Sequence, residues 1–214
     1  MSEPVLYGAA YSVYVRTARL VLAEKGVTYR LEEVDVFAPG GAPAEHWARH
    51  PFGRIPAFEH DGFRLYETGA ITRYVDEAFA GPPLQPADAR QRARMNQAIS
   101  VLDNYAYRCL VWDIFVERVR APANGRTPDE ARIAAALPLA RTCLAALPDI
   151  MGEAPFLAGA AVSLADLHAA PIFVYLAMAP EGRELLAREA PLAAWWERVK
   201  ARPSLAETRS PLEA

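Results

Sequence analysis

The side chains that could perform chemistry lie mostly in short stretches of the first 70 residues. Ser12 stands between a short β-type run, Val5–Tyr7, and a stretch with helical periodicity. A hydroxyl at such a junction can cap the helix, or donate a hydrogen bond to an anion near the helix amino terminus. Glu67 and Thr68 begin another helical stretch, where free backbone N–H groups can bind a carboxylate. For both positions, a plain helix cap is the alternative interpretation.

Other residue patterns do not support metal, phosphate or hydrolase chemistry. His46 and His50 are four residues apart and could bind a metal from one helical face, but no third ligand accompanies them and Arg49 lies between. We predict two surface histidines. Cys109 and Cys143 lack CxxC spacing and are predicted to be buried thiols on helices. No GxGxxG, GxxxxGK[ST] or GxSxG pattern is present.

The elements that must position these residues alternate in type up to about Phe79. The order is strand, helix, strand, then a hairpin and a third helix: Val5–Tyr7, residues 13–25, Thr28–Val36, Ala57–His60 with Phe63–Tyr66 around Asp61-Gly62, and residues up to Phe79. Gly26 is a helix stop, and Asp-Gly between alternating strands is a strong hairpin signal. The pattern predicts a small α/β domain.

Beyond Pro86, all periodicity is helical. Three prolines around Gly81 form a stiff linker. Met95, Leu102 and Cys109 repeat every seven residues, as in a helix packed in a bundle. Three further helical stretches follow, Ala131–Leu147 (which Pro138 starts, kinks or interrupts), Ser163–Met178 and Leu192–Ala201. We predict an α/β domain over residues 1–80, a linker over 81–87 and an all-helical domain over 88–214.

Composition narrows the class of protein further. The 214 residues are 52% hydrophobic and 23% charged, which excludes intrinsic disorder. The net charge of −3 argues against a nucleic-acid partner or a polybasic membrane anchor. No apolar run reaches the length of a membrane span, and no secretory signal is visible. We therefore expect a cytoplasmic protein with no membrane or nucleic-acid partner.

Several motifs together resemble those of one enzyme family. They read PFGRIPAFE at Pro51–Glu59, LYETGAI at Leu65–Ile71, LYGAAYS at Leu6–Ser12 followed by Arg16 and Glu24-Lys25-Gly26, FLAG at Phe156–Gly159, and SLADLH at Ser163–His168. The chain resembles the glutathione transferases, most closely the serine-using phi class and its bacterial relatives. The resemblance implies a thioredoxin-like βαβ-ββα domain followed by an all-helical domain, which is an α/β plus all-α fold.

The resemblance also implies roles for individual residues. Pro56 would follow a cis bond and turn the backbone of Ile55 toward glutathione. Thr68 would take the γ-glutamyl carboxylate and Glu67 the neighbouring ammonium. Ser12 would donate a hydrogen bond to the glutathione sulfur and favour the thiolate. Tyr7 is the rival donor, but matching the tyrosine-using relatives needs a one-residue shift, so we prefer Ser12.

One departure from the family pattern concerns the glycine end of glutathione. Phi-type sequences carry a His-Lys pair before Pro51 that helps to hold the glycine carboxylate, whereas Gly40–Ala44 has no cation. Arg54, where the family often has glutamine, could compensate. We therefore expect weak binding of glutathione for this class.

The function implied is attack of the glutathione thiolate on a hydrophobic electrophile, with a role in detoxification. Four aromatic side chains are candidates for the electrophile pocket, namely Tyr11, Tyr14, Tyr107 and Trp112. Glutathione is a co-substrate, no metal is implied, and a homodimer is expected because the helix Met95–Trp112 is long and apolar. The alternatives are a glutathione-dependent isomerase or peroxidase on the same site, and a non-catalytic protein that binds glutathione or apolar ligands.

Overall fold

The computed structural model describes residues 2–213 of the chain. They form two compact units, one of Met1–Pro83 with Pro203–Ala214 and one of Leu84–Arg202. The first is the α/β unit and the second is all-helical, so the predicted fold class is confirmed. The segment from Pro203 onward belongs to the α/β unit, although the sequence assigned it to the helical domain.

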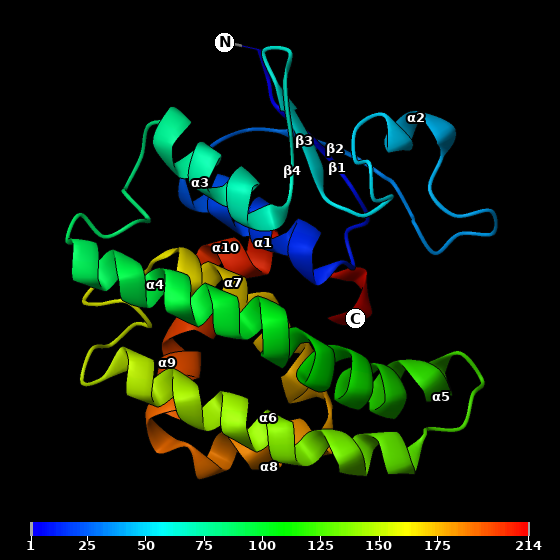
Figure 1. Cartoon of the computed structure of the whole chain (residues 1–214), viewed down its shortest axis with the longest axis vertical. Coiled ribbons are helices and arrows are strands. Elements are labelled where there is room, and N and C mark those ends of the chain that lie inside the picture. The colour runs from blue at the N-terminus through cyan, green and yellow to red at the C-terminus, as the bar shows by residue number, and fades with distance from the viewer. Residues whose placement is uncertain (1, 214) are drawn as a thin grey trace. The chain divides into compact units, whose positions relative to one another are not determined.

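The α/β unit is built on a small mixed sheet (Figure 1). Its strand order is β2-β1-β3-β4, with β1 (Val5–Tyr7), β2 (Arg30–Glu32), β3 (Ala57–His60) and β4 (Phe63–Tyr66). The hairpin is confirmed, and Asp61 and Gly62 both have positive φ, as its two-residue turn requires. The second strand is shorter than the predicted Thr28–Val36, because β1 offers only three residues for pairing.

Helices pack against this sheet and against each other. α1 (Val13–Glu24) packs on α3 (Thr68–Ala78), and their apolar faces bury Val15 and Ile71 with Leu6 of the sheet. α1 ends where Gly26 takes a positive φ, as the sequence predicts. The short α2 (Ala44–Trp47) was not predicted.

The C-terminal segment, with α10 (Pro203–Glu207) and the 3₁₀-helix η2 (Pro211–Glu213), lies along α1. Arg16 is 1% exposed, and its guanidinium donates to the Leu205 carbonyl at 3.0 Å and pairs with Glu213 at 2.5 Å. A buried charge needs such a partner. These contacts explain why the last residues join the α/β unit.

The helical unit contains seven helices among the described residues: α4 (Ala89–Val101), the π-helix η1 (Leu102–Arg120), α5 (Ala121–Ala123), α6 (Glu130–Met151), α7 (Leu164–Met178), α8 (Pro180–Arg188) and α9 (Ala190–Lys200). α4 continues directly into η1, and Met95, Leu102 and Cys109 along them are all buried, as the seven-residue repeat predicts. Figure 1 shows α6 alongside this long helix. Pro138 neither starts nor interrupts this helix, because α6 begins at Glu130 and continues to Met151, and a kink at Pro138 stays a prediction.

The start of α7 has a capping box made by Ser163 and Asp166. Asp166 is fully buried and accepts hydrogen bonds from the Ser163 N–H at 2.8 Å, the Leu157 N–H at 2.9 Å and the Trp195 indole N–H at 2.7 Å. Burial raises the pKa of Asp166, and these hydrogen bonds act in the opposite direction. Trp195 is buried and Trp196 is partly exposed.

One helix of the described residues, α6, is long and apolar enough to cross a membrane by length and composition. From the sequence, we expected no apolar stretch long enough to cross a membrane. Within the unit, Ile133, Ala140 and Leu144 of α6 are buried, and α6 packs against η1. These residues of α6 therefore belong to the core of the helical unit.

Candidate functional site

The sheet register brings three predicted site segments to one end of the α/β unit. Tyr7 at the end of β1 pairs with Ala57 at the start of β3, and Ala57 pairs with Tyr66 at the end of β4. The residues just beyond these strand ends are therefore neighbours in the sheet direction. They include what we call the strand-end group: Ser12, Ile55, Pro56, Glu67 and Thr68.

Ser12 is the N-cap residue of α1 and is half-buried. Its hydroxyl oxygen accepts from the Val15 N–H at 3.4 Å, and its carbonyl accepts from the Arg16 N–H at 2.9 Å. The hydroxyl hydrogen is not used in that cap, because the oxygen is the acceptor. The Ser12 hydroxyl therefore combines a cap with a donor at the positive end of a 12-residue helix.

Gly8 allows the strand-end group to approach closely. A Cβ at Gly8 would lie 2.4 Å from Val15 Cγ2 on α1 and 3.2 Å from Ile55 Cβ. Any larger residue would push apart the first turn of α1 and the Ile55–Pro56 peptide bond, which is cis. Gly8 was not among the predicted site residues, although a glycine directly after a strand indicates close backbone approach.

Glu67 occupies a strained backbone conformation at the start of α3. Its φ is +70°, in a region that few non-glycine residues adopt, and its side chain makes no cap hydrogen bond. Thr68, the first helical residue, is 7% exposed. The first N–H groups of α3 have no intrahelical partner. Strain of this kind concentrates at ligand-binding positions, so the turn is a candidate site for a carboxylate and an amine.

Residues 43–54, which we call the arm, contradict the predicted surface histidines. His46 is fully buried, and its Nε2 lies 2.7 Å from the Arg54 carbonyl oxygen. His50 is 2% exposed. The ring of Trp47 covers Gly53, where a Cβ would lie 2.6 Å from it. Both histidines therefore hold the arm together, and no group of three metal-ligating side chains occurs among the described residues.

Arg54 stands at the end of the arm and is exposed. Among the described residues, no acidic side chain forms an ion pair with its guanidinium. The Gly40–Ala44 loop is exposed at Gly40 and Gly41, which both have positive φ, and it contains no cation. The Arg54 side chain is thus available to a ligand anion.

The ring of Tyr7, the rival donor to the glutathione sulfur, contacts the side chain of Arg49. The Arg49 guanidinium lies 4.3 Å from the centre of its ring, which is a cation–π contact. Both residues line a polar cleft of about 270 Å³ with Glu32, Glu33 and His46. Ser12 is not part of this lining.

The predicted electrophile residues divide between the two units. Tyr11 is half-buried, and its hydroxyl donates to Asp35 Oδ1 at 2.6 Å; Tyr14, also half-buried, lies in the first turn of α1. Tyr107 and Trp112 are half-buried residues of η1, in the helical unit. Two of the four residues belong to each unit, so their joint role in one electrophile pocket stays a prediction.

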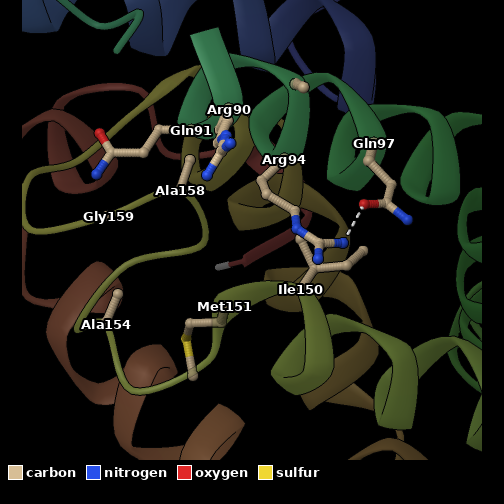
Figure 2. Close-up of a pocket in the computed structure, with 10 residues that line it drawn as sticks. Arg90, Gln91, Arg94, Gln97, Ile150, Met151, Ala154, Ala158 and Gly159 are labelled. Atoms are coloured by element: carbon tan, nitrogen blue, oxygen red, sulfur yellow. Dashed lines mark hydrogen bonds between the residues drawn. The ribbon is translucent and has the colours of Figure 1, made fainter. Parts of the chain in front are cut away.

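A larger cavity, of about 540 Å³, opens in the helical unit. Figure 2 shows Arg90 and Arg94 extending from α4 over it, facing Ile150 and Met151. None of the residues predicted to bind glutathione or the electrophile lines this cavity. Cavity size alone therefore does not locate the site.

Comparison with known protein families decides the family of the chain. The model of the glutathione S-transferase N-terminal domain matches residues 6–83, and that of the C-terminal domain matches residues 84–203. The chain belongs to the glutathione S-transferase family. The two matches divide between residues 83 and 84, which is also where the chain passes from the α/β unit to the helical unit. The first domain was predicted to end at residue 80.

Similar proteins match this chain over most of its length. The chain is 32% identical to glutathione S-transferase F14 of Arabidopsis thaliana, over 89% of this chain and 77% of that protein. The structure of glutathione transferase F7 from Populus trichocarpa matches with a TM-score of 0.84 at 28% identity, covering 96% of this chain and 97% of the other. A glutathione S-transferase I bound with lactoylglutathione matches with a TM-score of 0.85 at 26% identity, covering 97% and 98%. The protein is accordingly an enzyme, a glutathione transferase.

Proposed function

We propose that the transferase ionises the thiol of glutathione with Ser12 and directs the thiolate at a hydrophobic electrophile, as in serine-using, phi-like transferases. The observation that carries this proposal is the place of Ser12. It caps α1 with a donor hydrogen to spare, at the sheet end where Ile55 and the Glu67-Thr68 turn also lie. The bound lactoylglutathione of the similar glutathione S-transferase I supports glutathione as the thiol substrate.

The magnitudes are sufficient for ionisation near neutral pH. A free thiol has a pKa of about 8.5, and one unit corresponds to about 1.4 kcal/mol. A hydrogen bond to a charged acceptor contributes about 1.5–3 kcal/mol, and a helix amino terminus about 0.3–1 kcal/mol. The two together lower the pKa of the bound thiol by roughly one to three units. Once the shift exceeds about 1.5 units, most of the bound thiol is thiolate at pH 7.

The remaining parts of glutathione have matching partners in the same unit. The γ-glutamyl carboxylate meets the Thr68 hydroxyl and N–H at the start of α3, and the Glu67 carboxylate takes the ammonium. The Ile55 backbone faces the peptide groups, and the Arg54 guanidinium takes the glycine carboxylate. Two of these contacts depend on exposed side chains, those of Glu67 and Arg54, and the Gly40–Ala44 loop adds no cation at the glycine end.

The acceptor end of the reaction is less specific. Tyr11, Tyr14, Tyr107 and Trp112 are the aromatic side chains proposed for the electrophile pocket, and glutathione is the co-substrate, with no metal in the scheme. The same thiolate could serve an isomerase or a peroxidase, and a non-catalytic protein could keep the glutathione site without the chemistry. A panel of chloroaryl, epoxide, isothiocyanate and hydroperoxide substrates separates these functions.

We further propose a cytoplasmic homodimer, on different grounds from the sequence argument. The seam residues Met95, Leu102 and Cys109 are buried within the helical unit, so this repeat serves the core of that unit. Five aromatic side chains of the α/β unit are exposed: Phe37, Trp47, Phe52, Phe63 and Tyr66. Exposed apolar groups of this size favour an interface. Light scattering that gives a 23.5 kDa monomer at micromolar concentration would contradict the dimer.

The direct test of thiol activation is ultraviolet absorbance of the bound thiolate during a pH titration. We expect an apparent thiol pKa at least one unit below the free value of about 8.5. Activity toward at least one member of the panel should follow the same titration. Binding of glutathione with an unshifted pKa and no activity would favour the non-catalytic alternative.

A further inference from the structure

His50 belongs to the arm that ends at Arg54, one of the two charged side chains to which the proposed function assigns the ends of glutathione. Its ring centre is 4.9 Å from that of Tyr66, the residue before Glu67, and its ring is 2% exposed. The charges that act on it come from Glu67, from His46 and from Arg54. No role in the proposed reaction has yet been given to this histidine.

The ring also orders the backbone of the arm. His50 Nδ1 accepts the Phe52 N–H at 3.4 Å, and the His50 N–H donates to the His46 carbonyl at 2.9 Å. Nδ1 can accept only while it carries no proton, so this contact requires the neutral ring with its hydrogen on Nε2. Protonation would place two N–H donors against each other and loosen the turn that leads to Arg54.

We propose that neutral His50 is a positioning residue for glutathione, which couples the arm that carries Arg54 to the turn that carries Glu67. This inference rests on the proposed function, because it takes Arg54 and Glu67 as the partners of the two ends of glutathione. Its consequence is that the binding of glutathione and the protonation of His50 oppose each other.

The sign of this coupling follows from the Nδ1 contact. The arm keeps its turn only while Nδ1 carries no proton and accepts the Phe52 N–H. Burial is the largest influence on the pKa of His50 and lowers it; Glu67 raises the pKa, and His46 and Arg54 lower it. If glutathione binds the ordered arm, its binding favours the neutral ring, and by linkage the affinity falls as the pH falls through the pKa of His50.

The test measures the Kd of S-methylglutathione by calorimetry between about pH 7.5 and about pH 5, since this ligand has no thiol to titrate. We expect the Kd of the wild-type protein to rise about fivefold or more over this range. His50→Asn retains an acceptor for the Phe52 N–H that does not protonate. It should bind like the wild type at about pH 7.5 and change less than about twofold. His50→Leu lacks the acceptor and should bind more weakly at every pH.

A matched control is His60→Asn. His60 is another buried histidine of the same unit, at the end of β3 away from the site, and its Nδ1 lies 2.8 Å from the Tyr74 hydroxyl. This variant should keep the pH dependence of the wild type, and circular dichroism checks that all variants fold. An unchanged slope in His50→Asn, or an unchanged Kd in His50→Leu, overturns the proposal. Failure of the wild type to bind at any pH instead overturns the proposed function, and the role of His50 with it.

Discussion

The two sides of the proposed glutathione site are held by different kinds of interaction. The strand-end group is placed by backbone hydrogen bonds, because the register of β1, β3 and β4 brings three chain segments to one end of the sheet. The arm has no strand partner. Its shape depends on side chains, among them His46 bonded to the Arg54 carbonyl and Trp47 packed on Gly53.

Because of this difference, we expect the strand-end group to control the chemistry and the arm to control the affinity for glutathione. A register is shared among many backbone hydrogen bonds, so a side-chain change in the strand-end group should alter the chemistry and leave the frame intact. In the arm, one buried side chain determines where an exposed charge lies. Changes there should affect the Kd for glutathione more than kcat. The following variants test this division, starting with the largest expected effect.

Ser12→Ala should have the largest effect, because it removes the proposed donor to the thiolate. We expect kcat to fall by about one to three orders of magnitude with little change in KM, and the pKa of the bound thiol to rise. Steady-state kinetics and the ultraviolet thiolate titration measure the two effects. Tyr7→Phe is the control, because Tyr7 lies at the same strand end and should be nearly silent. The reverse result would make Tyr7 the donor.

The strand-end side of the site was also the part that sequence patterns could predict. Alternation and Asp61-Gly62 define the hairpin, and the hairpin fixes where Glu67 lies relative to Pro56. Gly26 and Ser12 delimit α1 in the same local way. Periodicity and turn residues act over a few positions, which is the range over which a sheet and its connections are determined.

The arm could not be predicted because its determinants are not local periodicities. Two histidines at i, i+4 are typical of a surface helix or of a metal pair, and nothing nearby indicates burial. Their burial arises from contacts with the Arg54 carbonyl and with Tyr66 on β4. The edge strand β2 was overestimated for a related reason, since its length is set by its partner.

Arg54→Ala should have the second largest effect, and it tests the role of the arm in glutathione binding. Removing the proposed partner of the glycine carboxylate should weaken glutathione binding by more than about tenfold, with kcat little changed. Calorimetry measures the Kd. Arg64→Ala is a matched control, because Arg64 is an exposed arginine of the same unit that pairs with Glu59. If Arg54→Ala binds like the wild type, Arg54 has no role at that carboxylate.

His46→Leu should have an intermediate effect through the same arm. The substitution removes the hydrogen bond to the Arg54 carbonyl while it keeps an apolar side chain in a fully buried position. Loss of about 1 kcal/mol in holding Arg54 corresponds to about a fivefold rise in Kd. Combined with Arg54→Ala, the additional effect on Kd should vanish, because no charge is left to position. A full additional effect in the double variant would show that His46 acts elsewhere.

Ala42→Lys should have the smallest effect. It tests whether glutathione binding at the Gly40–Ala44 loop is limited by the missing positive charge or by the lack of a fixed loop conformation. Ala42 is half-buried, between two glycines of positive φ and Pro43, so a lysine there brings a cation on a flexible loop. An exposed ion pair is worth about 0.2–1 kcal/mol, which predicts a Kd for glutathione about 1.4- to fivefold lower. The gain should shrink at high salt, because an exposed pair is screened. γ-Glu-Cys, which lacks the glycine carboxylate, should show no gain with this variant. An equal gain for both ligands would mean that the lysine acts through the general charge of the unit, and a missing gain for both would mean that the loop needs order before charge can help.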